Sequence, residues 1–253
     1  MRIDKQRFTR RSLLAGGAVF GSSVALEPGA AISKSYSGEM PWSEGVANAP
    51  RPASPGAYVF FTPAEVAFVD AAVARLIPAD DLGPGAKEAD VTIFLDRQLA
   101  GDYGRAQRWY MLGPWQQGAE TQGYQSRLTP AQLYRISIAF IDDHCRKAFD
   151  NKAFSALSLQ RQDEMLMRLE KGQLRVPGIG PRPIEGEGVK SDTFFAQLLQ
   201  NTIEGFFSDP LYGGNREMVA WKLIGFPGAR YDYRDYVSEH GKKLNLAPIA
   251  IKA

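Results

Sequence analysis

The sequence has few of the residues that most often carry chemistry, with a single cysteine and two histidines among its 253 residues. Cys145 cannot form a disulfide within the chain, so we expect packing alone to hold the fold. We expect this thiol to be buried, with an intersubunit bridge as the alternative. Uninterrupted apolar runs of about 20 residues are also missing, so the sequence offers no ordinary membrane-spanning helix.

Motifs for several enzyme and cofactor classes are absent as well. The sequence has no Cys-x-x-Cys-His for attached haem, no Gly-x-Ser-x-Gly nucleophile motif and no Walker pattern for phosphate binding. Gly178-Ile179-Gly180 lacks the third glycine of a dinucleotide site, and we interpret it as loop. We therefore assign this chain no catalytic residue, no bound cofactor and no metal site.

The first 25 residues have the composition of an export signal. They carry five basic groups and one acidic group, and the pair Arg10-Arg11 precedes a short apolar stretch, SLLAGGAVFGSSVAL. This arrangement is typical of a bacterial twin-arginine signal, which directs folded proteins across the inner membrane to the periplasm. We expect cleavage after Ala25, with Ala31 as a second option, and an uncleaved N-terminal anchor is the alternative.

The charge of the chain gives no indication of a nucleic-acid partner once the signal is set aside. The whole sequence has a formal net charge of +2. Residues 1–25 contribute +4 to this total, which leaves −2 for the remainder. Because nucleic-acid-binding domains are usually strongly basic, we expect no nucleic-acid partner for the chain after cleavage.

Beyond the signal, the sequence divides into a leader and one domain. Residues 26–57 are rich in proline, glycine, alanine and serine, which predicts an extended leader. Residues 58–253 contain about six segments with helical apolar spacing and little strand-like alternation. We therefore predict an all-α fold: a single irregular domain of about six helices with long ordered loops and an irregular aromatic C-terminal segment.

Two of the expected helices have the same start signal, a threonine, a proline and then a glutamate or glutamine in TPAE at 62–65 and TPAQ at 129–132. These residues form a capping box, and they predict one helix that stops at Pro78 and another that runs to about Asp150. The second helix should bury a stripe of Leu133, Ile136, Ala139, Phe140 and Ile141. Further helices are expected at 89–99, at 158–171, at 191–208 with Ser191 or Asp192 as its cap, and at 215–223.

Carboxylate, imidazole and thiol groups follow one another in Asp142-Asp143-His144-Cys145. Consecutive residues on a helix point in different directions, so these side chains should not converge on one metal ion. We interpret His144 as a structural or surface residue. The alternative is a stand-alone periplasmic helical enzyme or metal-binding protein that uses Asp142, Asp143 and His144.

Aromatic residues concentrate in two irregular stretches, 101–127 and 209–233. Tryptophan, tyrosine and arginine are the residue types that most often anchor protein–protein interfaces. Tryptophans equally fill the core of a domain, and for Trp109, Trp115 and Trp221 both interpretations stay open.

Both stretches carry a resemblance to one family. DPLYGGNR at 209–216 and WKLIGFPGARY at 221–231, together with RWY at 108–110, GPW at 113–115 and QGY at 122–124, closely resemble the gluconate 2-dehydrogenase small subunit family, also called subunit 3 or gamma. The resemblance covers most of the chain after the signal, and the twin-arginine start agrees with it.

The resemblance implies a non-catalytic accessory subunit. Such subunits accompany an FAD-containing catalytic large subunit, often with a multihaem cytochrome c subunit, in membrane-bound complexes that oxidise sugars or sugar acids at the periplasmic face. The catalytic subunit typically lacks its own signal and is carried by the small subunit to the twin-arginine export machinery. The family assigns the small subunit no catalytic residues. We expect partner contacts at Trp109, Trp115, Tyr212, Trp221, Arg230, Tyr231 and Tyr233.

Overall fold

The structure, a computed structural model, describes residues 57–113, 119–124, 126–176, 189–230, 232–242, 244 and 246–251. The predicted signal with Arg10 and Arg11 lies outside these ranges, as does the predicted leader except for Ala57. Trp115 and Tyr231 also lie outside them.

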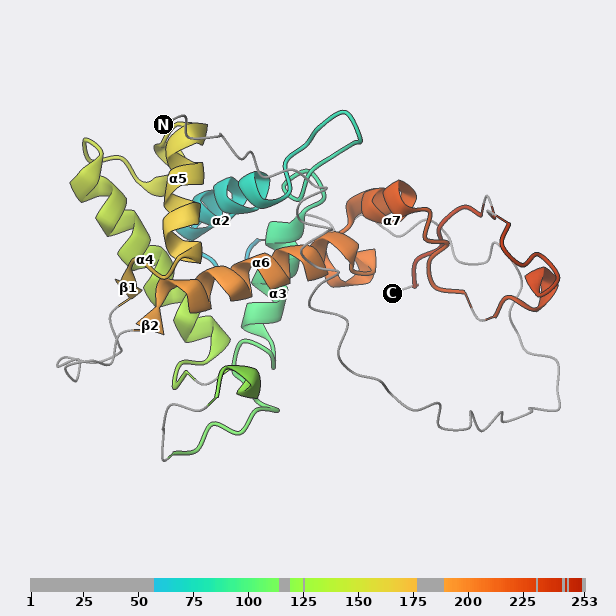
Figure 1. Ribbon diagram of the computed structural model, residues 1–253, viewed down its shortest axis with the longest axis horizontal. Coiled ribbons are helices and arrows are strands. Elements are labelled where there is room, and N and C mark those ends of the chain that lie inside the picture. Colours follow the sequence, from blue (N-terminus) through green and yellow to red (C-terminus); the bar gives the residue numbers. More distant parts are fainter. Residues whose placement is uncertain are drawn as a thin grey trace.

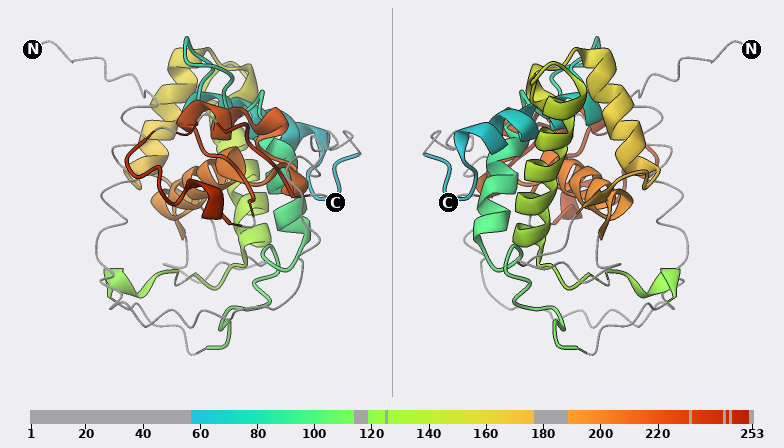
Figure 2. Two further views of the ribbon diagram at one scale, coloured as in Figure 1. Left: turned by 90° about the vertical axis from the view of Figure 1, so that its right-hand side faces the viewer. Right: turned by 90° about the vertical axis from the view of Figure 1, so that its left-hand side faces the viewer.

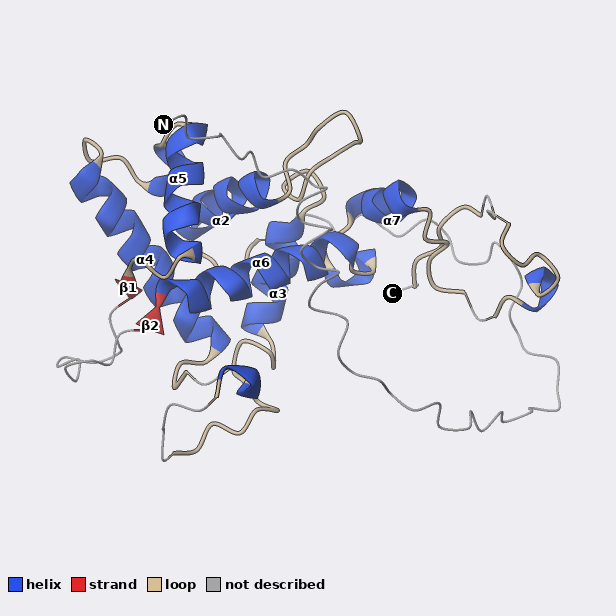
Figure 3. Cartoon of the chain, in the orientation of Figure 1, coloured by secondary structure: helices blue, strands red, loops and turns tan. Residues whose placement is uncertain are grey.

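Within these ranges the fold is all-α, as the sequence predicts (Figures 1 and 3). The six α-helices of the described part are α2 (Pro63–Leu76), α3 (Val91–Ala100), α4 (Pro130–Ala148), α5 (Leu159–Glu170), α6 (Ser191–Phe207) and α7 (Val219–Ile224). The strands β1 (Arg175–Val176) and β2 (Val189–Lys190) pair antiparallel, with Arg175 opposite Lys190. Long loops and short 3-10 turns join these elements.

Both predicted capping boxes are present. At the start of α2 the Glu65 N–H donates to the Thr62 hydroxyl at 3.4 Å, and the Glu65 carboxylate accepts the Thr62 N–H at 2.8 Å. Thr129 and Gln132 make the same pair of bonds at the start of α4. Because these bonds satisfy backbone donors that a helix start leaves open, the local sequence alone determines where both helices begin.

The buried face of α4 differs from the predicted stripe. Leu133 and Ile141 are buried as expected, but Ala139 is exposed, and Ile136 and Phe140 are only partly buried. The inward face consists of Pro130, Leu133, Tyr134, Ser137, Ile138, Ile141, Asp142 and Cys145. The prediction was therefore wrong about the rotation of this helix, although its position along the chain is correct.

Two polar contacts explain the rotation of α4. The hydroxyl of Tyr134 accepts a hydrogen bond from Nδ2 of Asn201 on α6 at 3.0 Å. In the C-terminal half of the helix, the carboxylate of Asp142 accepts the backbone N–H of Phe154 at 3.0 Å. Both contacts are buried, so losing either would leave a polar group without its partner, and apolar spacing alone does not reveal them.

Phe68 of α2 is one of the largest side chains in the core. Its side chain is fully buried, and its ring lies 4.8 Å from the ring of Phe154 and 6.5 Å from that of Phe194. Phe194 belongs to α6, which packs against α2, α3, α4 and α5 (Figure 1). α6 is therefore the central helix of the body.

The start of α6 also corrects a prediction. Neither Ser191 nor Asp192 caps this helix; the cap residue is Lys190, without a side-chain hydrogen bond. The Ser191 hydroxyl instead donates to the carbonyl of Leu169 at 3.1 Å and accepts the N–H of Leu174 at 3.3 Å. Ser191 thus ties α6 to the end of α5 and the loop after it.

Residues 209–228, which carry the family resemblance, pack closely on the body. A Cβ atom at Gly214 would lie 2.1 Å from the carbonyl oxygen of Gly205, so only glycine allows this approach to α6. Asn215 is fully buried; its Nδ2 donates to the carbonyl of Ser208 and its Oδ1 accepts the N–H of Ala220, each at 2.9 Å. The block therefore serves the chain's own fold at this point.

The same block breaks the short helix that we expected at 215–223. Residues Arg216–Met218 form a 3-10 turn, and α7 begins only at Val219. Asn215, Glu217 and Met218 all have positive φ, which is incompatible with a continuous α-helix. The described part after Gly225 is irregular, as predicted, apart from a 3-10 turn at Arg234–Tyr236 and a bridge between Gly228 and Ile249.

Replacing Asn215 with alanine should destabilise the protein by about 3 kcal/mol, because it removes one buried and one partly buried hydrogen bond and keeps a left-handed backbone. Asn151 provides a matched control, since it also has positive φ but is exposed. Asn151→Ala should cost only about 1 kcal/mol, the strain of the backbone alone. Urea unfolding measures both values, and equal losses would show that the Asn215 side chain contributes nothing.

Candidate partner interface

The predicted contact residues are of three kinds in the structure: accessible to solvent, outside the described residues, or buried. Trp109, Tyr212 and Tyr233 are exposed, and Arg230 is partly buried. Trp115 and Tyr231 lie outside the described residues. The third group is Trp221 alone, whose side chain the chain itself covers.

Trp221 belongs to the core of its own chain. Its side chain is 5% exposed and packs in a small cluster with Met218 and Ala250. The indole N–H donates to the carbonyl of Phe207 at 2.8 Å, and the ring meets that of Phe226 edge-on at 5.1 Å. Of the two interpretations left open for this tryptophan, core packing is the one that its burial favours.

The loop after α3 presents its apolar groups in two ways. The Trp109 ring lies between those of Tyr103 and Tyr124, at 5.9 Å and 5.1 Å, so it braces the loop while 36% exposed. Tyr110 next to it is 80% exposed, and Leu112 is exposed as well. Sequence reasoning singled out Trp109 by residue type and missed these two neighbours, which reach further into solvent.

A second exposed apolar set lies around α7 and the C-terminal segment. Figure 2 shows these elements lying across one end of the helical body, and Figure 1 places them at one end of the molecule's long axis. The exposed members that the sequence analysis did not name are Ile224, Phe226, Val237 and Ile251. They lack a helical or strand period, so no periodic signal could have identified them.

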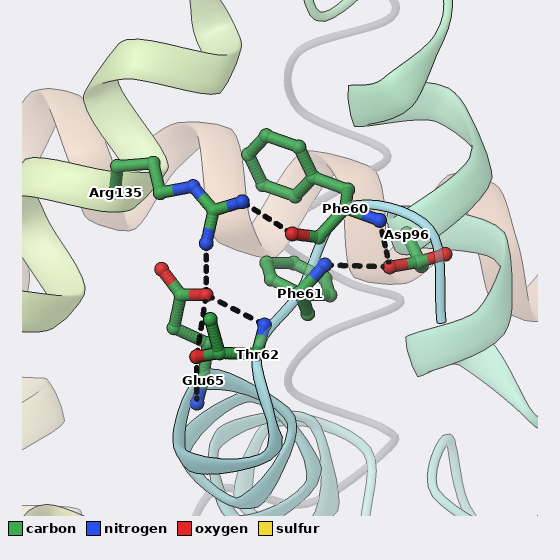
Figure 4. Close-up of polar contacts among 6 residues, drawn as sticks. All are labelled: Phe60, Phe61, Thr62, Glu65, Asp96 and Arg135. Carbon is green, nitrogen blue, oxygen red and sulfur yellow. Dashed lines mark hydrogen bonds and ion pairs between the residues drawn. The ribbon is translucent and has the colours of Figure 1, made fainter. Parts of the chain in front are cut away.

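The junction between the leader and the body is held by a buried carboxylate (Figure 4). Asp96 of α3 accepts the backbone N–H groups of Val59, Phe60 and Phe61 at 2.8, 2.9 and 2.8 Å. An ionised carboxylate forms stronger hydrogen bonds than a neutral acceptor. Asp96 therefore fixes the chain just before α2, and we call this site the N-terminal clamp.

Arg135 of α4 completes the N-terminal clamp from the other side (Figure 4). Its guanidinium carbon lies 4.2 Å from the centre of the Phe60 ring, and the group also donates to the Phe60 carbonyl and pairs with Glu65. Stacking, hydrogen bonding and an ion pair thus converge on one side chain. Because Asp96 and Arg135 come from different helices, the clamp forms only where α3 and α4 are in place.

The side chains of Asp142, Asp143 and His144 on α4 do not point toward a common site. Asp142 is buried at the Phe154 N–H, whereas Asp143 is exposed and pairs with Lys147 at 2.6 Å. His144 Nε2 lies 3.3 Å from a guanidinium nitrogen of Arg168. No group of three or more histidine, cysteine, aspartate or glutamate side chains in the described ranges is arranged to hold a metal ion.

The protonation behaviour of this region fits a structural role. Burial, and then the positive charge of Arg168, lowers the pKa of His144, so its neutral form is favoured. Burial raises the pKa of the Cys145 thiol to about 11, with a further contribution from Asp142. A buried, protonated thiol is a poor nucleophile and a poor partner for an intersubunit bridge.

We expect the Asp96→Asn variant to loosen the N-terminal clamp at a cost of about 2 kcal/mol, because the amide replaces charge-assisted hydrogen bonds and turns a donor toward a backbone N–H. Amide hydrogen exchange should then quicken at residues 59–61. Asp102→Asn is the control: this exposed carboxylate pairs with Arg105, and its loss should stay below about 0.5 kcal/mol. Unchanged exchange at 59–61 would contradict the role of Asp96.

The thiol of Cys145 should react with a maleimide or disulfide reagent at pH 8 roughly a hundredfold more slowly in the folded protein than in denaturant, because little thiolate forms while it is buried. The reaction is followed by intact mass. Equal rates in the two states would show that the thiol is accessible in the folded protein. An intersubunit disulfide through Cys145 would then be favoured again.

The part of the chain that matches a known protein family coincides with the helical body. The family model for gluconate 2-dehydrogenase subunit 3 matches residues 63–228, more than half of the chain. The match begins at the first residue of α2 and ends at Gly228, where the bridge to Ile249 forms. No curated protein and no solved structure matches the chain. In the described ranges no helix is both long and apolar enough to cross a membrane. The chain belongs to the gluconate 2-dehydrogenase subunit 3 family.

Proposed function

We propose that this chain is a non-catalytic small subunit that escorts an FAD-containing catalytic subunit through twin-arginine export and then stabilises it in the periplasm. Membership of the family implies a complex with catalytic partners. A multihaem cytochrome c is the further subunit that we propose, with FAD and haem bound by the partners. The proposal includes a location for the complex at the periplasmic face of the inner membrane.

The observation that carries this proposal is the exposed aromatic surface on a member of a subunit family. Tyr110, Tyr212, Phe226 and Tyr233 all reach solvent from loops or short turns around a well-packed body. Large aromatic side chains on rigid supports give contact area at a small cost in side-chain entropy. They are also the residue types that dominate the binding energy of protein interfaces.

Stabilising a catalytic subunit requires no reactive group. A partner that binds the folded form and not the unfolded form shifts the folding equilibrium by mass action, by about 2.7 kcal/mol when its concentration is a hundred times the dissociation constant. What this function needs is a sufficiently large and complementary surface, of the order of 1,000 Å² or more in total.

The N-terminal clamp fits a protein whose signal is recognised by an export machinery for folded proteins. Asp96 and Arg135 hold residues 59–61, so the chain that leads back to Arg10 and Arg11 is attached to an assembled body. A signal carried in this way accompanies a folded domain, and a bound catalytic subunit would follow it.

The stand-alone enzyme or metal-binding protein is not favoured as a second function. The proposed ligands Asp142, Asp143 and His144 are engaged with Phe154, Lys147 and Arg168 respectively, in three separate environments. Their arrangement leaves no shared point at which a ligand would meet all three.

The export step is tested by changing Arg10 and Arg11 to lysine in cells that also produce the catalytic subunit. The periplasmic fraction should lose at least tenfold of its dehydrogenase activity, which should remain in the cytoplasmic fraction, because lysine keeps the charge but not the paired-arginine signal. Arg2→Lys with Arg7→Lys is the matched control, since it makes the same exchange outside the pair. Full periplasmic activity of the Arg10/Arg11 variant would refute the escort function.

A further inference from the structure

The described residues between 229 and 248 form a protruding loop, and we call the segment 229–248 the C-terminal arm. It leaves the body beyond α7 and returns to it at Ile249, and Figure 1 shows it directed away from the helices. None of its described residues is buried. The described part of the arm is therefore a long loop that contributes no side chain to the core.

The two ends of the arm are closed by a fixed neck. The N–H of Ala229 donates to the carbonyl of Ile249 at 2.7 Å, and the N–H of Ile249 donates to the carbonyl of Pro227 at 3.2 Å. Gly228 has φ of 81°, and a Cβ atom there would lie 2.1 Å from the Ile249 carbonyl oxygen. The neck thus depends on a glycine that can adopt a left-handed conformation and approach another backbone closely.

The neck is in turn anchored to the body. Ala250 is buried against Trp221 and Met218, and the N–H of Ile251 donates to the carboxylate of Asp209 at 2.8 Å. Both ends of the arm therefore have a defined position, and the arm itself points outward from a rigid base.

Contacts within the described part of the arm include local turns, the ion pairs Arg234–Asp232 and Lys242–Glu239, and one contact across the width of the arm. Backbone hydrogen bonds join Tyr236 to Tyr233 and Glu239 to Tyr236, and the Arg230 guanidinium donates to the carbonyl of Ala247. Such turns do not offset the conformational entropy of ordering a segment of this length without buried side chains. Long loops without secondary structure of their own are usually functional, often as binding elements.

The composition of the arm indicates a protein as the occupant. Its tip exposes Tyr233 and Val237. Its ionic side chains are nearly balanced, with four basic residues (Arg230, Arg234, Lys242, Lys243) and three acidic ones (Asp232, Asp235, Glu239). A nucleic acid or an anionic lipid surface would favour a clear excess of basic groups. A mixture of tyrosine, arginine and both signs of charge is typical of protein interfaces.

We infer that the C-terminal arm is a docking element that contacts the catalytic subunit of the complex. The family match ends at Gly228, the residue where the neck closes, so the arm lies outside the part that the family model describes. An element outside that shared part is suited to distinguish one catalytic subunit from another. This inference rests on the proposed function and assigns one contact surface to it.

The test places a charge at the tip of the arm and, as a control, at a matched position elsewhere. Val237 is 62% exposed, and Leu159, at the start of α5, is 61% exposed. α5 and the arm lie at opposite ends of the molecule in Figure 1. Val237→Asp and Leu159→Asp thus make similar changes at similar exposure, and neither should alter the thermal unfolding of the isolated full-length chain.

Each variant is produced together with the FAD-containing catalytic subunit and purified through a tag on this chain. The readouts are the flavin bound per chain and the dissociation constant of the complex. Val237→Asp should weaken binding at least tenfold, because it buries a charge in the contact, whereas Leu159→Asp should stay within twofold of the unmodified chain.

The outcomes separate the inference from the function on which it rests. If the unmodified chain retains no flavoprotein, both the proposed function and the inference fail. If it retains flavoprotein and Val237→Asp binds as well as Leu159→Asp, only the arm inference is overturned. If the isolated chain forms a dimer that only Val237→Asp dissociates, the arm joins two copies of this chain and the inference is wrong.

Discussion

The backbone of the 209–228 block meets the end of α6 where Gly214 approaches the carbonyl of Gly205 so closely that no side chain would fit. This contact joins the C-terminal part of the molecule to its central helix. Asn215 follows immediately and ties the turn to Ser208 and Ala220, which sets the direction of α7. Trp221 on α7 then packs against Ala250, next to the residue Ile249 that closes the neck. A shift at the glycine pair would therefore be transmitted to the exposed surface at that end.

The local part of the fold could be predicted from the sequence, because short-range chemistry determines it. The Thr62 and Thr129 capping boxes involve side chains three residues apart, and both helix starts are where the sequence places them. The rotation of α4 could not be predicted, since it depends on Asn201, far away in the chain. Ser191 failed as a predicted cap for a similar reason: its hydroxyl binds Leu169 and Leu174 instead.

The candidate interface could be predicted by residue type but not by position. Trp221 and Tyr110 look alike as large aromatics in loop-rich sequence, yet one is 5% and the other 80% exposed. The difference arises because Trp221 finds a carbonyl partner and an apolar cluster across the chain. Exposure of this kind results from tertiary packing, and composition contains no information about it. The block with the strongest family resemblance consequently builds the fold and supports the contact surface, with Tyr212 as its exposed member.

The two ends of the described chain are each fixed to the helical body by specific contacts. The N-terminal clamp fastens the segment that leads to the predicted signal, and the neck fastens the arm. Between them lies a helical body in which Asp142 of α4 accepts the Phe154 N–H and His144 lies beside Arg168. The most direct test of this account is native mass spectrometry of the assembly purified through this chain from the periplasmic face of the membrane. The account predicts a mass that includes this chain and an FAD-containing subunit. This chain found alone, with dehydrogenase turnover of its own, would contradict it.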